Sequence, residues 1–350
     1  MRPSRRLFLS SLAALAVARP SWADAGSPAW LAAAKEGEDY RLHGLSETGE
    51  SLFALPLPAR GHAAAAHPTR PLAVAFARRP GTYALVIDCV TGAQTHRLTP
   101  PPGRQFNGHG AFASDGRVLY TSEVVAEGSE GRIGIWETEG FTRMGEWISG
   151  GIGPHDIKLT KAGLIVANGG IQTDPGDRTK LNIDTMAPNL TLLSKGGSIL
   201  DQVSLPDLPQ ASIRHLVLTE TGVAFAMQWE GDPAEVVPLL GHWVPGSAPV
   251  LFAAPEGEAH RMQGYAGSIA RARDGRLAIS SPKGGAVQVF APDGTFLATH
   301  ARADVCGLSA LGAGFVTSDG NGGICALDQQ VTPLAHHEAA WDNHMVALIL

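Results

Sequence analysis

Five histidines occupy equivalent positions in a repeated pattern of the sequence. In the clearest copies a short apolar run follows the histidine, a glycine stands seven or eight residues after it, and a second apolar run follows, as in HGAFASDGRVLY. Neutral imidazole is the most common protein ligand for metals, and several imidazoles together suit copper, iron or zinc. We therefore expect a transition-metal site, with iron or copper as the hypothesis, formed by His62, His109, His155, His215 and His344.

Two further copies keep the pattern without the histidine. One begins at Gly267-Ser268 and the other at Cys306. We expect Cys306, if its thiol is free, to add a thiolate ligand that would favour copper or zinc. The Gly267-Ser268 copy predicts a gap in the ring of ligands.

The repeat length predicts the architecture that brings these positions together. The repeats begin at residues 62, 109, 155, 215, 267, 306 and 344, so the steps are 47, 46, 60, 52, 39 and 38 residues. Such steps suit units of four short strands, and Asp-Gly pairs between apolar runs indicate hairpins. The pattern is typical of a β-propeller, in which the first strand of each blade lines a central channel. The repeated positions would then meet at one mouth of that channel.

Seven copies predict an all-β, seven-bladed propeller whose last blade is closed by both chain ends. The copy at His344 supplies one strand only, HMVALIL, and three strand-like runs stand near the other end: AWLAAAKE, DYRLHGL and SLFALPL. A six-bladed ring, with a weak repeat at 267 or 306 miscounted, is the alternative. The longest step holds an insertion, residues 169–189, which we interpret as a functional loop on one rim.

The N-terminal residues predict export. Ser4-Arg5-Arg6-Leu7-Phe8-Leu9 has the form of a twin-arginine motif, an apolar stretch runs to residue 18, and small residues follow at 23–25. We expect residues 1–25 to be a twin-arginine signal peptide, residues 26–350 to form a single propeller domain, and the protein to be periplasmic. Twin-arginine export moves folded proteins, which often carry a cofactor.

Charge and cysteine content limit the partners. The formal charge of −6 becomes about −9 when residues 1–25 are removed, because they hold four arginines and one aspartate. An acidic chain without basic runs is a poor nucleic-acid binder, no second apolar stretch has membrane length, and we expect a monomer. Among the three cysteines, Cys306 and Cys325 are the pair to consider first for a disulfide, although spacing alone cannot assign it.

The residues around the repeated positions offer supporting chemistry. Carboxylates and amides next to the histidines could fix the imidazole tautomers; these are Asn107, Asp156, Asp304, Asp342 and Asn343. Arg214 could oppose an anion at the mouth, or it could be solvated or bridge two blades.

Other aromatic and histidine residues carry weaker interpretations. Trp229 and Trp341 could wall the cavity or belong to the core. We interpret the remaining histidines as surface or turn residues; those considered are His43, His67, His96, His300, His336 and His337. Each site histidine alone could also serve only to cap a strand, although five at equivalent positions are hard to explain that way.

No sequence motif names a reaction. The chain has no Walker loop, nucleophile elbow, zinc-protease helix, haem attachment site or dinucleotide fingerprint. Catalytic residues therefore stay unknown and no organic cofactor site is predicted. Asp156 and Asp304 are the nearest acid or base candidates.

Several long sequence blocks resemble a known family. They include RGHAAAAHPTRPLAVAFARRPG, NGHGAFASDGRVLYTSE, GIGPHDIKL, KLNIDTMAPNL and WDNHMVAL, and the likeness covers nearly all residues after the signal peptide. These blocks resemble the DUF1513 family of exported proteins, which has no established activity. The resemblance implies a seven-bladed propeller of the quinoprotein amine dehydrogenase-like type. It also implies an association with imelysin-like proteins and a dihaem, peroxidase-like oxidoreductase, and through them with iron acquisition.

A second resemblance concerns plan rather than sequence. A histidine ring in a seven-bladed propeller is similar to the copper-cluster domain of nitrous oxide reductase, but the cupredoxin domain of that enzyme has no counterpart here. Three functions stay open: a periplasmic metal-binding accessory of iron or copper handling, a metal-dependent redox enzyme using the same site, and a metal-free interaction scaffold.

Overall fold

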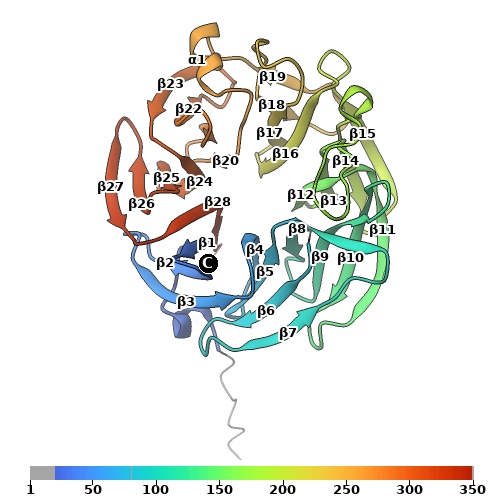
Figure 1. Cartoon of the computed structure of the whole chain (residues 1–350), viewed down its shortest axis with the longest axis vertical. Helices are drawn as coiled ribbons and strands as arrows, with labels where there is room; N and C mark the ends of the chain where they lie inside the picture. Colours follow the sequence, from blue (N-terminus) through green and yellow to red (C-terminus); the bar gives the residue numbers. More distant parts are fainter. Residues whose placement is uncertain (1–19, 80, 349–350) are drawn as a thin grey trace, which may run out of the picture.

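Seven antiparallel sheets are arranged around a central axis, as Figure 1 shows. This computed structural model describes residues 20–79 and 81–348. Each sheet has four strands, and the innermost strands are β28, β4, β8, β12, β16, β20 and β24. The seven-bladed prediction is confirmed, and the six-bladed alternative is wrong.

The first three blades contain the N-terminal strands and the last strand of the chain. Blade 1 consists of β28 (Ala340–Ala347), β1 (Trp30–Glu36), β2 (Asp39–Leu45) and β3 (Ser51–Leu57). Blade 2 consists of β4 (Gly61–Ala66), β5 (Leu72–Ala77), β6 (Ala84–Asp88) and β7 (Gln94–Leu98). Blade 3 consists of β8 (Arg104–Phe112), β9 (Val118–Val125), β10 (Glu130–Glu137) and β11 (Arg143–Ile152).

The other four blades follow in chain order. Blade 4 consists of β12 (Pro154–Leu159), β13 (Gly163–Asn168), β14 (Asn189–Ser194) and β15 (Ile199–Ser204). Blade 5 consists of β16 (Ala211–Leu218), β17 (Val223–Trp229), β18 (Leu240–Trp243) and β19 (Val250–Phe252). Blade 6 consists of β20 (Ser268–Arg271), β21 (Leu277–Ser281), β22 (Ala286–Phe290) and β23 (Phe296–Ala301). Blade 7 consists of β24 (Val305–Leu311), β25 (Gly314–Asp319), β26 (Gly323–Leu327) and β27 (Val331–His336).

Helical structure is limited to short segments: η1 (Trp22–Ala25), η2 (Ile183–Thr185) and α1 (Glu256–Arg261). Within the described ranges, no helix combines the length and the apolar character needed to cross a membrane.

The ring closes within blade 1, as the sequence predicts. Strand β28 pairs with β1, with Ala32 opposite Met345 and Ala34 opposite Trp341. The two ends of the chain therefore share one sheet, in which β28 is the innermost strand and β1 is paired on both sides.

A β-bulge interrupts six of the seven innermost strands near the mouth of the channel. In blade 2 the pairing register shifts between Gly61 and Ala64, around His62, and in blade 4 it shifts between Pro154 and Ile157, around His155. Equivalent shifts occur in β8, β16, β24 and β28, whereas β20 pairs with β21 in an uninterrupted register. A bulge redirects side chains locally. The repeated sequence pattern therefore encodes both a residue type and the irregular backbone that aims it.

The apolar cores lie between neighbouring blades. Between blades 2 and 3, for example, Phe76 of β5 and Phe106 of β8 are both fully buried, with ring centroids 6.3 Å apart. Because the second strand of each blade is buried on both faces this way, it carries a near-continuous apolar run in blades such as 2 and 4, LAVAFA in β5 and GLIVAN in β13.

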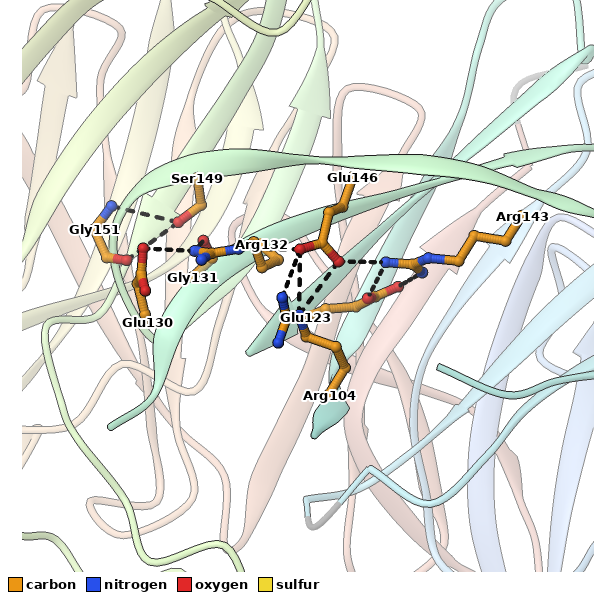
Figure 2. Close-up of polar contacts among 9 residues, drawn as sticks. All are labelled: Arg104, Glu123, Glu130, Gly131, Arg132, Arg143, Glu146, Ser149 and Gly151. Atoms are coloured by element: carbon orange, nitrogen blue, oxygen red, sulfur yellow. Dashed lines mark hydrogen bonds and ion pairs between the residues drawn. The ribbon is translucent and has the colours of Figure 1, made fainter. Parts of the chain in front are cut away.

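A network of ion pairs lies within blade 3 (Figure 2). Glu123 of β9 is fully buried and accepts two hydrogen bonds, 2.8 and 2.9 Å long, from Arg143 of β11. Arg143 also donates to Glu146 (2.9 Å), which accepts further bonds from Arg104 and Arg132. The network ties all four strands of the blade together through charged groups.

Replacement of Arg143 by alanine should therefore destabilise the fold. The change leaves the buried Glu123 carboxylate without its partner, and such a loss costs about 3–5 kcal/mol in the free energy of unfolding. Urea denaturation measures the effect, with Arg117→Ala, in the exposed β8–β9 turn, as the control. A difference between the two variants of less than about 1 kcal/mol would contradict this account.

Residues at the start of the described chain belong to the core. Trp22 is 3% exposed, and its indole N–H donates to the carbonyl oxygen of His67 (2.9 Å). Trp22 and Ala25 pack in the cluster that includes Leu31 and Tyr83. Residues 1–19 of the expected signal peptide lie outside the described residues.

The burial of Trp22 argues against removal of residues 1–25, the signal peptide expected from the sequence, and we expect cleavage on the N-terminal side of Trp22 instead. Removal through residue 25 would take a buried tryptophan from the core, at a cost of about 3–5 kcal/mol. The intact mass of the exported protein gives the cleavage site. A mature chain that begins at residue 26 and unfolds at the same urea concentration as one that keeps Trp22 would contradict this expectation.

The three cysteines are free and buried. Cys306 lies on β24 and Cys325 on β26, with β25 between them. Two strand spacings separate such residues by about 10 Å, beyond the Cα distance that a disulfide can bridge. The pair considered from the sequence is therefore not bonded.

Candidate functional site

The five histidines form one compact cluster on the axis. They come from five consecutive blades, with His344 on β28, His62 on β4, His109 on β8, His155 on β12 and His215 on β16. Eight pairs of their ring centroids lie 4.5 to 5.9 Å apart. The predicted convergence is therefore realised, and the gap predicted at Gly267-Ser268 lies in the blade whose inner strand has no bulge.

Two groups of three histidines could each hold a metal ion. One is His62, His109 and His344, and the other is His109, His155 and His215, with the ligand nitrogens of each group within 4.8 Å of one another. His109 belongs to both groups and contacts the other four rings.

One pair of ring nitrogens already has a metal-compatible separation. The Nε2 atoms of His62 and His344 lie 3.3 Å apart. Two nitrogens bound to one ion at about 2.0–2.1 Å in a tetrahedral arrangement are also separated by about 3.3 Å. The same distance fits a hydrogen bond between the rings in the absence of metal.

Burial favours the neutral form of four of the imidazoles. All five are 5–9% exposed. Burial lowers the pKa of His62 to about 4 and lowers the pKa of His155, His215 and His344 well below its usual value, with neighbouring rings adding to the effect. Neutral imidazole is the form that binds metal, so these four rings need lose no proton to serve as ligands near pH 7.

Two buried carboxylates orient rings from neighbouring blades. Asp156 of β12 lies 3.5 Å from Nδ1 of His109, and it accepts bonds from Lys158 (2.9 Å) and from the backbone N–H of Leu216 (2.9 Å). Asp342 of β28 lies 3.6 Å from Nδ1 of His62. Each carboxylate faces one ring nitrogen and leaves the other, Nε2, for the cluster, as is common for metal-binding histidines.

Local cations keep both carboxylates ionised. Burial alone raises the pKa of Asp156, but the Lys158 ammonium and the contact with His109 outweigh it and lower that pKa overall. Burial likewise raises the pKa of Asp342, but the contacts with His62, Arg60 and Arg78 outweigh this effect and lower that pKa overall. The two predicted supporting aspartates therefore act as hydrogen-bond acceptors rather than as proton donors.

Several buried ring nitrogens have no hydrogen-bond partner among the described residues: Nδ1 of His62, Nε2 of His109, Nδ1 of His155 and Nδ1 of His215. A buried polar atom without a partner is unfavourable, and native proteins hold few of them. Nδ1 of His62 at least faces the Asp342 carboxylate, 3.6 Å away. The other three, in one cluster, indicate that something outside the chain completes the site.

Cys306 is not brought into the histidine cluster. Its thiol donates to the carbonyl oxygen of Trp341 (3.2 Å), it packs among apolar residues, and burial raises its pKa to about 12. A thiol held protonated in this way is a poor metal ligand. We therefore omit Cys306 from the proposed site.

The other predicted neighbours have mixed outcomes. Asn107 donates to the carbonyl oxygen of Pro154 and so joins blades 3 and 4, which are neighbours. Asn343 of blade 1 donates to the hydroxyl of Tyr265 (3.0 Å), which stands just before β20 of blade 6, so this bond links two blades that are not adjacent. Asp304 lines the cavity above the cluster, where burial raises its pKa.

Two histidines interpreted from the sequence as surface or turn residues are buried. His43 is 2% exposed and bonds to Ser51 (2.8 Å), so a surface position is wrong for it. His67 does lie in the turn between β4 and β5, but it is 4% exposed and accepts backbone N–H groups through Nδ1. The sequence interpretation gave no weight to such partners from neighbouring turns and strands. Trp229 packs against two core clusters and Trp341 within a third, which places both in the core.

A cavity of about 430 Å³ opens onto the cluster. His62, His155 and His215 line it, together with seven cationic side chains and a single carboxylate, that of Asp304. Among these cations, only Arg214 was indicated by the sequence pattern. Arg60 could have been predicted from the sequence, because it stands two residues before the repeated His62. Arg178 and Lys180 come from the insertion at residues 169–189, which supplies them to the rim.

The fold and the cluster define the class: a seven-bladed β-propeller with a buried five-histidine site on its axis. The profile of DUF1513, described as "protein of unknown function", matches residues 55–348. The chain belongs to this family.

Comparison with characterised proteins adds only the fold. No curated protein sequence matches the chain. Among solved structures, "Structure of U3-55K" superposes with a TM-score of 0.58 at 13% identity, over 79% of this chain and 81% of that one. "Streptogramin B lyase structure" gives 0.57 at 14% identity, over 79% and 84%.

The lowered pKa of His62 predicts a pH dependence of stability. Between about pH 4 and pH 6.5 the unfolded chain binds a proton at this position and the folded metal-free protein does not, so stability falls as the pH drops through this window. Urea denaturation at a series of pH values gives the free energy of unfolding. For metal-free His62→Gln this free energy should change with pH less steeply than for the native chain, by up to about 1.4 kcal/mol per pH unit. Above about pH 7.5 the free energies of unfolding of the variant and of the native chain should change with pH in the same way. Identical slopes across pH 4–6.5 would contradict a buried neutral His62.

Proposed function

We propose that this protein is a periplasmic metal-binding propeller that serves as an accessory of iron or copper acquisition or handling. The convergence of five buried imidazoles carries the proposal, together with the unpartnered ring nitrogens of His109, His155 and His215. Structural capping would accept hydroxyl or amide side chains equally well and would not gather the rings on the axis.

The ligand set supports a transition metal. Imidazole nitrogens suit copper, iron and zinc, whereas calcium and magnesium prefer oxygen ligands. His109 joins both possible groups, so one ion could use either group, or two ions could share the cluster.

The cellular setting rests on sequence. The twin-arginine motif supports export to the periplasm, and the resemblance supports imelysin-like and dihaem peroxidase-like proteins as partners. A carrier that serves such partners would bind its metal reversibly.

A redox enzyme using the same site is the alternative function. The cavity favours it, because a reactant could reach His62, His155 and His215 from outside. An enzyme would turn over a substrate with the metal retained, whereas a carrier would release the metal to a partner or chelator. A metal-free interaction scaffold would leave the unpartnered nitrogens unexplained.

Elemental analysis of the natively exported protein, purified without an affinity tag or chelator, tests the proposal. We expect about one or more equivalents of iron or copper per chain. His109→Gln should weaken binding by about 100-fold or more, since loss of an outer-shell partner alone costs 10- to 100-fold. The double variant His109→Ala/His155→Ala should abolish binding.

His260→Gln, on the exposed helix α1, is the matched control and should keep its full metal content. Circular dichroism and urea denaturation show whether each variant is folded. A folded wild-type protein that contains no transition metal and takes up neither iron nor copper would overturn the proposal, as would a folded His109→Ala/His155→Ala variant that binds like wild type.

A further inference from the structure

The cavity above the histidines has a charge opposite to that of the chain. The whole chain carries a formal charge of −6, yet seven arginine and lysine side chains line this one cavity beside a single lining carboxylate. Cations gathered in a partly enclosed space repel one another, and their field attracts anions.

Four of the cations already have carboxylate partners. Arg60 and Arg78 contact Asp342, at 2.6 and 3.6 Å, and Lys180 and Arg214 contact Glu230. Each carboxylate is thus shared by two cations, so these pairs still leave an excess of positive charge. Arg214 is 7% exposed, and its Nε has no hydrogen-bond partner among the described residues. A buried guanidinium that lines a cavity and keeps a free donor indicates a missing acceptor.

The other three cations, Arg79, Arg178 and Lys283, form no ion pair with a carboxylate of the described residues. Burial lowers the pKa of Arg79 to about 9, with Arg214, Arg178 and Arg78 adding repulsion. Arg178 occupies a left-handed backbone conformation, φ +72°, in the insertion loop. Lys283 lies over the Tyr265 ring, 5.2 Å from its centroid. The loop and the β21–β22 turn therefore present cations to the cavity without neutralising them.

A bound metal would increase the imbalance. The five imidazoles contribute no negative charge, and the nearby Asp156 and Asp342 already compensate Lys158, Arg60 and Arg78. An ion of charge +2 or +3 next to these arginines is costly unless an anion accompanies it.

We propose that the cavity binds a small polycarboxylate, which reaches from the arginines at the rim to the histidine cluster and binds there together with the metal. The pairing with a metal rests on the proposed function, whereas the anion site itself does not. The cations stand on separate segments: the residues before β4 and after β5, the insertion loop, β16 and the β21–β22 turn. Charges spread in this way match a ligand with several separate carboxylates better than one tetrahedral oxyanion, and arginine binds carboxylates through paired hydrogen bonds.

Calorimetric titration of the metal-free protein with citrate tests the anion site, with succinate and inorganic phosphate as comparison ligands. We expect citrate to bind most tightly and its affinity to fall as salt is added. Arg79→Gln/Arg178→Gln should weaken citrate binding by about 10-fold or more, because charge-assisted hydrogen bonds to the citrate carboxylates are lost. Arg117→Gln, in the exposed β8–β9 turn, is the matched control and should bind citrate like wild type.

Three results would overturn the inference: no citrate binding at low salt, citrate binding unchanged in Arg79→Gln/Arg178→Gln, or phosphate bound as tightly as citrate. Metal uptake measured in a buffer without carboxylates separates this test from that of the proposed function. Metal binding without citrate binding would leave the proposed function standing and remove the anion site. Citrate binding without metal uptake would retain the anion site and remove the metal. If both bind, citrate should raise the metal affinity of wild type and not that of Arg79→Gln/Arg178→Gln.

Discussion

Closure of the ring through β1 and β28 is the constraint on which the site depends. This pairing joins residues from the two ends of the chain and places His344 against His62, 282 positions apart in sequence. Bringing such distant segments together costs chain entropy, which grows only slowly with the length of the loop. The ladder of β1 and β28 and the apolar clusters on either side of blade 1 offset that cost. The histidine cluster thus belongs to the closed ring, because one of its two groups that could hold a metal ion does not exist without closure.

The β-bulges of the inner strands direct the histidine side chains of the closed ring toward one another. In a regular strand, alternate side chains enter the layers between blades, where the cores lie. A bulge at the mouth changes that direction, and the histidine-bearing strands share this irregularity. Blade 6, whose inner strand pairs without a shift, contributes no ring to the cluster and leaves room for Tyr265 and Lys283 at the cavity. Blade 7 also contributes no ring, although β24 has a bulge, because Cys306 stands at its repeated position, so the asymmetry of the site comes from these two blades.

The electrostatics of the axis change over a short distance. Deep in the channel, burial favours neutral imidazoles, and two carboxylates from neighbouring blades hold ring nitrogens in orientation. Toward the rim, arginines and lysines outnumber the carboxylates that face them. A neutral nitrogen site below a cationic rim is suited to a metal ion accompanied by its own anionic ligand. Neither layer alone would select that combination.

The sequence by itself determined the seven repeats, the closure of the last blade, and the five histidines, because a repeat records which positions are equivalent and a ring makes equivalent positions neighbours. It also indicated Asp156 and Asp342, which stand next to the repeated histidines. Only the tertiary structure showed that Cys306 lies outside the cluster and that His43 and His67 are buried. Only the tertiary structure, too, brought Arg79, Arg178 and Lys283 together at one mouth of the channel. These residues lie outside the repeat, or depart from it, and their roles depend on contacts between blades and loops. The free energy of such contacts depends on distances and burial, which the order of residues does not contain.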